Sequence, residues 1–149
     1  MEPVSAAASV VGLVAFAGQL IQGLAKVNSF VQEMKDSDDR IKDLTRESKL
    51  LTQTLTELKS VLVGLEGSSV IKNHAYWDPN ASSIRGILEA CQNDLDQWEQ
   101  SYMPKQEGSG AKRMFRLVWN GSLRKARDLQ SKFAYHRSQI STSIATINT

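Results

Sequence analysis

Few residues in this 149-residue chain have the types and spacing that catalysis or metal binding requires. His74 and His136 are far apart in the sequence, and Cys91 is the sole cysteine, so no set of residues has the usual metal-ligand spacing. Cys91 falls on the apolar face of a predicted helix, where a small buried side chain is far more common than a nucleophile. No nucleophile–base pair or acid–base pair of carboxylates is recognisable, so we expect neither enzyme activity nor a metal site.

One segment imitates a phosphate-binding loop. Residues 18–23 read GQLIQG, which matches the first part of the P-loop pattern. Leu24 and Ala25, however, occupy the positions where a P-loop needs lysine and serine or threonine. The segment also lies inside a predicted helix with no strand before it. We therefore expect no bound nucleotide and no other cofactor.

The same segment belongs to an uncharged run from Pro3 to Ala25. Apolar residues recur through and beyond this run at alternating spacings of three and four, which predicts one stripe along an α-helix: Val10, Leu13, Ala17, Leu20, Leu24, Val27, Val31 and Met34. The residues around the stripe are small or weakly polar, among them Gly12, Ala15, Gln19 and Gln22. Such a helix suits a soluble bundle, and lipid would accept most of its remaining surface.

The run is long enough for a membrane span, about 20 residues, but it is a weak candidate. Serines, glutamines and three glycines lower its hydrophobicity, and the apolar stripe continues past Lys26, as in a bundle helix. Glu2 is the only charge before Lys26, so the basic start of a secretory signal is missing. We expect this helix to be part of a soluble fold at rest.

Further apolar patterns predict the other elements. A leucine-rich seam with strict three-four spacing is typical of a long bundle helix: Ile41, Leu44, Ser48, Leu51, Leu55, Leu58, Leu62 and Leu65. Helices are predicted over about 4–34, 38–65, 83–103, 112–119 and 122–147, and the turn residues of 66–81 predict a loop. The fold class is therefore all-α. We expect one domain over 1–149, an up-and-down four-helix bundle with one short extra helix before the last long one.

Charge is distributed unevenly along the chain. The segment from Lys112 to Arg137 carries a net charge of +7, whereas the rest of the chain carries −5. The basic segment either lies beside acidic helices within the bundle or binds an anionic partner, a membrane surface or nucleic acid. Aromatic residues interleave with its basic residues, but no nucleic-acid-binding signature is present, so a nucleic-acid partner is not expected.

Three stretches resemble a known family: the opening MEPVSAAASVVGLVAFAGQLIQGLAKV, the seam IKDLTRESKLLTQTLTELKSVL and the later AKRMFRLVWNGSLRKARDLQSKFAYHRSQIS. Together they resemble the fungal N-terminal domain of STAND (NLR-like) and ankyrin-repeat proteins, the HeLo-like group, over essentially all 149 residues. The resemblance implies a helical bundle similar to the executioner domains of plant resistance proteins and of the pseudokinase of animal necroptosis. Family members often carry another acidic or polar residue early, where this chain has only Glu2.

The family resemblance also implies a function. Such domains usually head larger chains that carry a nucleotide switch and repeats, and they act in programmed cell death, heterokaryon incompatibility or innate immunity. Their hydrophobic first helix, Val4 to Val27 here, is the part that engages membrane after clustering. Some members have no demonstrated killing role, so the fold alone does not determine the activity.

We therefore expect a cytoplasmic signalling domain that self-associates and reaches the plasma membrane when it is activated. The expected partners are further copies, C-terminal switch or repeat domains, and an anionic membrane. The expected membrane-engaging residues are Val10, Leu13, Phe16, Leu20, Leu24 and Val27, and the expected anionic-lipid contacts are Arg113, Arg116, Arg124, Lys125 and Arg127. The alternative is a non-lytic helical module that oligomerises or docks a partner protein and never enters lipid.

Overall fold

The computed structural model describes the backbone of residues 4–32, 39–102 and 123–148, and within these ranges it is all-α, with no strand. The elements are α1 (Val4–Gln32), α2 (Asp39–Leu65), α3 (Ser69–Lys72), α4 (His74–Tyr102) and α6 (Leu123–Asn148). Side chains are described for residues 10–29, 42–100 and 127–148. The predicted short helix over 112–119 lies outside the described residues.

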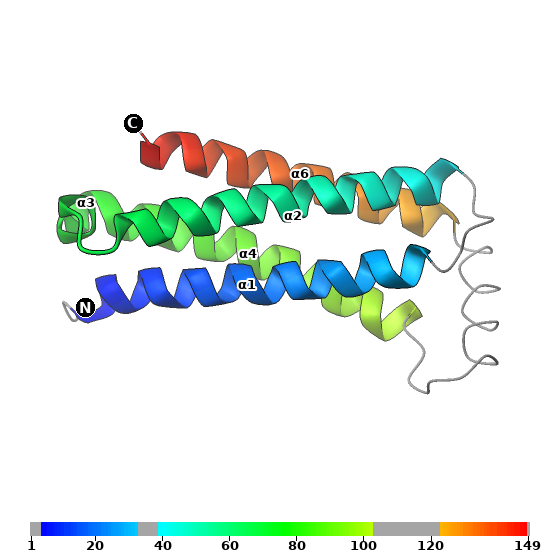
Figure 1. Ribbon diagram of the computed structural model, residues 1–149, viewed down its shortest axis with the longest axis horizontal. Coiled ribbons are helices and arrows are strands. Elements are labelled where there is room, and N and C mark those ends of the chain that lie inside the picture. The colour runs from blue at the N-terminus through cyan, green and yellow to red at the C-terminus, as the bar shows by residue number, and fades with distance from the viewer. Residues whose placement is uncertain (1–3, 33–38, 103–122, 149) are drawn as a thin grey trace.

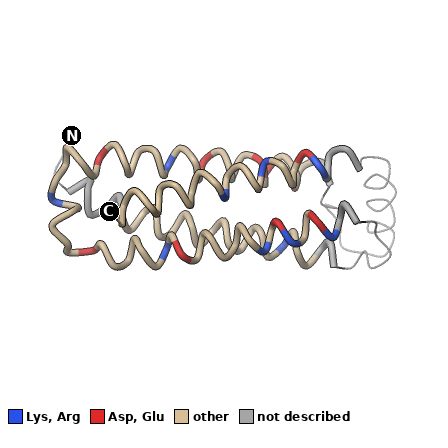
Figure 2. The backbone as a smooth tube through the Cα atoms, turned by 90° about the horizontal axis from the view of Figure 1, so that it is seen from above, with Lys and Arg blue, Asp and Glu red and all other residues tan. Residues whose placement is uncertain are grey.

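Four long helices, α1, α2, α4 and α6, run lengthwise through the molecule (Figure 1, Figure 2). Consecutive long helices run in opposite directions (Figure 1). α1 packs against α2 and α4, and α6 packs against the same two helices. As a result, α1 and α6 lie on opposite sides of the α2–α4 pair (Figure 1).

The apolar stripes predicted from the sequence form the core. Leu44, Leu51, Leu55, Leu58 and Leu62 of α2 are completely buried, and Ser48 in the same seam is buried with them. The same three-four spacing marks one face of α4 and one face of α6, and both faces are buried, namely Ile84, Leu88, Cys91, Leu95 and Trp98 of α4, and Leu129, Phe133, His136, Ile140, Ile144 and Ile147 of α6. The three-four spacing therefore identified the core-facing side of each long helix correctly.

The predicted loop over 66–81 is wrong for most of its length. α3 occupies Ser69–Lys72, and α4 begins at His74, nine residues before the predicted start of that helix at residue 83. The Trp77 backbone N–H donates to the Asn73 carbonyl at 2.8 Å, which closes the first turn of α4. The chain reverses just before α3, at Gly67, whose φ of +77° is a conformation that glycine adopts without strain.

Burial explains why this segment is helical despite its turn residues. Trp77 is completely buried and Ala81 nearly so, and both belong to the apolar core. Pro79 lies in the second turn of α4, where it removes one backbone donor. Asn80 Nδ2 donates to the Tyr76 carbonyl at 2.8 Å, which adds a bond within the same turn. The burial of a tryptophan outweighs the local turn preference of residues 78–80.

Candidate functional site

The inner stripe of α1 lies in the core. Its six described members are 0–1% exposed, namely Val10, Leu13, Ala17, Leu20, Leu24 and Val27. They share one continuous apolar cluster with the buried leucines of α2. Five of these six were predicted to engage membrane, and in the structure they are turned away from solvent.

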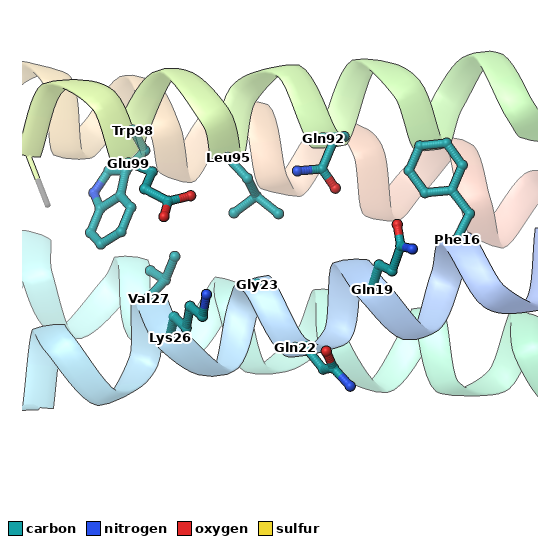
Figure 3. Close-up of a pocket in the computed structure, with 10 residues that line it drawn as sticks. All are labelled: Phe16, Gln19, Gln22, Gly23, Lys26, Val27, Gln92, Leu95, Trp98 and Glu99. Carbon is teal, nitrogen blue, oxygen red and sulfur yellow. The ribbon is translucent and has the colours of Figure 1, made fainter.

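Phe16, the sixth residue predicted to engage membrane, lies elsewhere on the helix. It is half-buried and lines a hollow between α1 and α4 instead of the contact with α2 (Figure 3). The difference follows from helix geometry, since Phe16 is one residue before the inner-stripe residue Ala17 and so points about 100° away from it.

The outer face of α1 carries no charge over most of its length. Exposed positions on this face are Val11, Gly12, Ala15, Gln19, Gln22 and Ala25, and the first charged residue that follows is Lys26. Val11 is 59% exposed, which is unusual for a large aliphatic side chain. Within the described residues, Val10–Ser29 is the one segment long and apolar enough to cross a membrane, although length and composition alone are weak evidence. Only 33% of that window is buried.

Polar contacts join α6 to both of its neighbours. His136 Nε2 donates to Asp94 Oδ2 of α4 at 2.6 Å, and Lys132 Nζ lies 3.7 Å from the other oxygen of the same carboxylate. On the opposite side, Arg137 Nε donates to Glu47 Oε1 of α2 at 2.6 Å. We call these contacts the α6 polar links; they are formed by Lys132, His136 and Arg137 of α6 with Asp94 of α4 and Glu47 of α2. The side chains of His136, Asp94 and Glu47 are largely buried, where such bonds are stronger than on the surface, whereas Lys132 is exposed.

The described part of α1, residues 10–29, has no comparable links. Among the side chains described for residues 10–29, none forms a hydrogen bond or ion pair with a described residue of another helix. The contacts of α1 with α2 and α4 therefore come from apolar packing.

This contrast between α1 and α6 was missed at the level of sequence, where His136 was treated as isolated. The available signal was that Asp94 and Glu47 directly flank the core positions Leu95 and Ser48.

The residues predicted to contact anionic lipid fall mostly outside the described side chains. Arg113 and Arg116 lie outside the described residues altogether, and Arg124 and Lys125 lie in the first turn of α6 with side chains that are not described. Arg127 is exposed. Two other basic residues of the same segment, Lys132 and Arg137, pair with acidic residues of α4 and α2. The basic segment is thus at least partly used for internal pairing.

Cys91 is completely buried, as its place on the apolar face predicted. Burial raises the pKa of its thiol to about 12, and the nearby Asp94 carboxylate adds to the effect. A thiol held in its neutral form is a poor nucleophile. In the part of the chain that the structure describes, no group of three or more His, Cys, Asp or Glu residues is arranged to hold a metal ion.

Comparison of the chain with protein-family models, with curated proteins and with solved structures gives no match.

Proposed function

We propose that this chain is a cell-death or immune signalling domain of the fungal STAND (NLR-like) kind, which acts by self-association and membrane engagement through α1. In this proposal the domain is a HeLo-like up-and-down four-helix bundle and the N-terminal part of a larger cytoplasmic receptor. The proposal draws on the sequence resemblance and on the physical character of α1.

One observation carries the proposal: α1 is the long helix whose exterior suits lipid. Its inner stripe is apolar, its outer face is uncharged as far as Ala25, and the described side chains hold it to the other helices by apolar packing. Transfer to lipid would break no ion pair of these side chains. The inner stripe would stay out of water in either location, so most of its hydrophobic free energy, about 25 cal/mol per Å² of buried apolar surface, would be retained.

Departure of α1 would uncover the buried leucines of α2, and this cost favours self-association. A single chain that released α1 would expose Leu51, Leu55 and Leu58 to water, at about 1.5–3 kcal/mol for each side chain. Neighbouring copies would cover this surface and raise the local concentration of α1 at the membrane. Clustering by an attached switch domain is therefore the expected trigger.

The basic segment would add electrostatic attraction to an anionic membrane. Exposed arginines and lysines near such a surface contribute about 1 kcal/mol each. Arg127 has the exposure that this role needs, and Arg113, Arg116, Arg124 and Lys125 are proposed to act with it.

The decisive experiment compares one substitution at two exposed helix positions, Ala15→Asp in α1 and Ala90→Asp in α4. Both positions face solvent, so both variants should fold with similar stability. A charge at the centre of a spanning helix costs about 2.5–3.5 kcal/mol on insertion. We expect Ala15→Asp to reduce dye release from anionic vesicles by on the order of 100-fold, while Ala90→Asp releases dye like the parent protein. Equal release by the two variants would contradict insertion of α1.

The second candidate function, a non-lytic interaction module, is favoured by exposed aliphatic side chains. Val11 of α1 and Val63 of α2 are 59% and 51% exposed and could dock onto another protein. This candidate predicts a stable oligomer by light scattering and no partitioning of the parent protein to vesicles at any protein concentration. Dye release by the parent protein in the experiment above would exclude it.

A further inference from the structure

A hollow of about 320 Å³ lies between α1 and α4, away from the α1–α2 contact and from the α6 polar links (Figure 3). Its size is at the lower end of the range for small-molecule sites, about 300–1,000 Å³. Gly23 forms part of its wall, and a methyl group in place of the glycine hydrogen would lie 3.2 Å from Leu95 Cδ1. The absence of a side chain at Gly23 therefore keeps this part of the gap open.

The lining combines apolar and polar groups. Phe16 and Val27 of α1 and Leu95 and Trp98 of α4 supply apolar surface. Gln19 and Gln92 point into the gap from opposite helices (Figure 3). The Gln92 side-chain nitrogen donates to Asp96 at 2.8 Å, so its carbonyl oxygen is the group that it can offer to a bound molecule.

Two opposite charges stand at one end of the hollow. Lys26 of α1 and Glu99 of α4 point toward the gap beside Val27 and Trp98 (Figure 3). Both side chains are exposed, and no ion pair joins these two described residues to each other. A simple anion here would be repelled by Glu99 and a simple cation by Lys26, whereas a molecule with both charges satisfies both residues.

We propose that this hollow binds a zwitterionic amphiphile, whose anionic group contacts Lys26, whose cationic group contacts Glu99 and whose apolar body packs on Leu95 and Trp98. A phosphocholine or phosphoethanolamine head with the start of an alkyl chain has this chemistry. Because Lys26 and Glu99 belong to different helices, the bound molecule links α1 to α4. Where the proposed function holds, this link opposes the release of α1, so the site deepens that function by regulating it.

The test uses dodecylphosphocholine below its micelle concentration, followed by NMR of the ¹⁵N-labelled protein. We expect saturable shifts of the Gly23 backbone amide and of the Gln19 and Gln92 side-chain amides. Free phosphocholine lacks the apolar body and should bind at least ten-fold more weakly. Dodecyl sulfate, which has only the anionic charge, should bind at least five-fold more weakly at these residues. No shift at Gly23, or binding of either comparison molecule as tight as that of dodecylphosphocholine, overturns the proposal.

Substitutions of exposed charged residues distinguish binding in the hollow from general binding of detergent to the protein. Lys26→Gln and Glu99→Gln should each weaken binding at least five-fold, and both should fold because the two side chains are exposed. Lys72→Gln and Glu89→Gln are the matched controls, since these residues are exposed and do not line the hollow. Unchanged binding in the first pair of variants overturns the assignment.

The proposed link between α1 and α4 is tested by a separate measurement, amide hydrogen exchange. Saturating dodecylphosphocholine should slow amide hydrogen exchange in α1 at least three-fold relative to α6, and unchanged exchange in α1 would overturn the proposed link. Neither binding nor exchange depends on vesicle leakage. Failure of the site is therefore distinguishable from failure of the proposed function, which the Ala15→Asp comparison tests.

Discussion

α1 and α6 occupy equivalent places in the fold, on opposite sides of the α2–α4 pair, yet they are held in different ways. Each buries an apolar stripe against the same two helices. α6 adds polar contacts to both neighbours, a hydrogen bond from His136 and ion pairs from Lys132 and Arg137, whereas the described side chains of α1 rely on apolar packing. Apolar packing can be replaced by lipid, but a directed bond to a partly buried carboxylate cannot. Under the proposed function, α1 is therefore the helix expected to leave, and α2, α4 and α6 are the part expected to stay together.

The largest expected effects come from matched substitutions that would create a cavity beside α1 or beside α6. Leu24 of α1 and Ile140 of α6 are 0% and 1% exposed, and alanine at either position should lower the free energy of unfolding by about 2–5 kcal/mol. Hydrogen exchange then distinguishes them. Leu24→Ala should accelerate exchange mainly in α1, because that helix can open alone, whereas Ile140→Ala should accelerate exchange throughout the protein. Identical exchange patterns in the two variants would show that α1 and α6 open together.

A smaller effect is expected when the α6 polar links are broken. Asp94→Ala removes the partner of His136 and Lys132 and should lower the free energy of unfolding by about 1.5–3 kcal/mol, the range for hydrogen bonds to charged groups. Urea denaturation measures the loss. Asp96→Ala is the control, because its carboxylate is exposed and, among the described residues, accepts a bond from Gln92 within its own helix, and it should cost less than about 0.5 kcal/mol. A loss no larger than that of the control would mean that the links through Asp94 do not help to hold α6 against α4.

Cys91 provides a pH-dependent probe of the part that stays together. Burial raises the pKa of this thiol from 9.0 to about 12, so between these values the unfolded chain loses the proton that the folded chain keeps. Stability is unaffected below pH 9 and falls as the pH rises toward 12. pH 10 is one unit above the pKa of this thiol in the unfolded chain. At that pH, ionisation of the thiol lowers the free energy of unfolding by about 1.4 kcal/mol.

The measurement compares urea denaturation at pH 7.5 and pH 10 in the parent protein and in Cys91→Ala. The parent protein should lose about 1.4 kcal/mol more than the variant between the two pH values. Comparing each protein with itself removes the cost of the missing side chain, and taking the difference between the two proteins removes the contribution of other titrating groups. If both proteins lose the same stability, Cys91 ionises as readily in the folded state as in the unfolded one, and its surroundings are more open than its burial indicates.

The apolar periodicity of the sequence predicted the all-α class and the buried side of each long helix. An apolar stripe with a spacing of three and four residues lies on one face of an α-helix, and that face must be buried to leave contact with water. Local turn preference misled the prediction at residues 66–81. There, Trp77 and Ile71 gain more from burial in the core than residues 78–80 lose by becoming helical. This gain depends on where other helices lie, so it is not visible in a local pattern.

The polar links were not predictable for a related reason. Asp94 and His136 are 42 residues apart, and Glu47 and Arg137 are 90 residues apart. His136 falls on the apolar stripe of its helix, whereas Asp94, Glu47 and Arg137 each have the sequence context of a solvated or half-buried helix position. The rotation and height of α6 relative to α2 and α4 bring the pairs together, and apolar spacing determines the rotation only approximately. The hollow beside Gly23 has the same origin, since it depends on how closely α1 and α4 approach.

The smallest effects come from glycine-to-alanine substitutions in α1. They test two sides of this helix separately, the open side at Gly12 and the side that faces α4 at Gly23. An alanine Cβ at Gly12 would meet no atom within 4 Å, so Gly12→Ala should raise the free energy of unfolding by about 0.5–1 kcal/mol through helix propensity alone. Gly86→Ala in α4 is the matched reference, since its Cβ also meets nothing. At Gly23 the same gain is opposed by the contact with Leu95 Cδ1 at 3.2 Å, so Gly23→Ala should be close to neutral in thermal or urea denaturation. A full gain at Gly23, equal to that at Gly12, would mean that Leu95 yields without cost and that α1 and α4 are less closely packed than this contact requires.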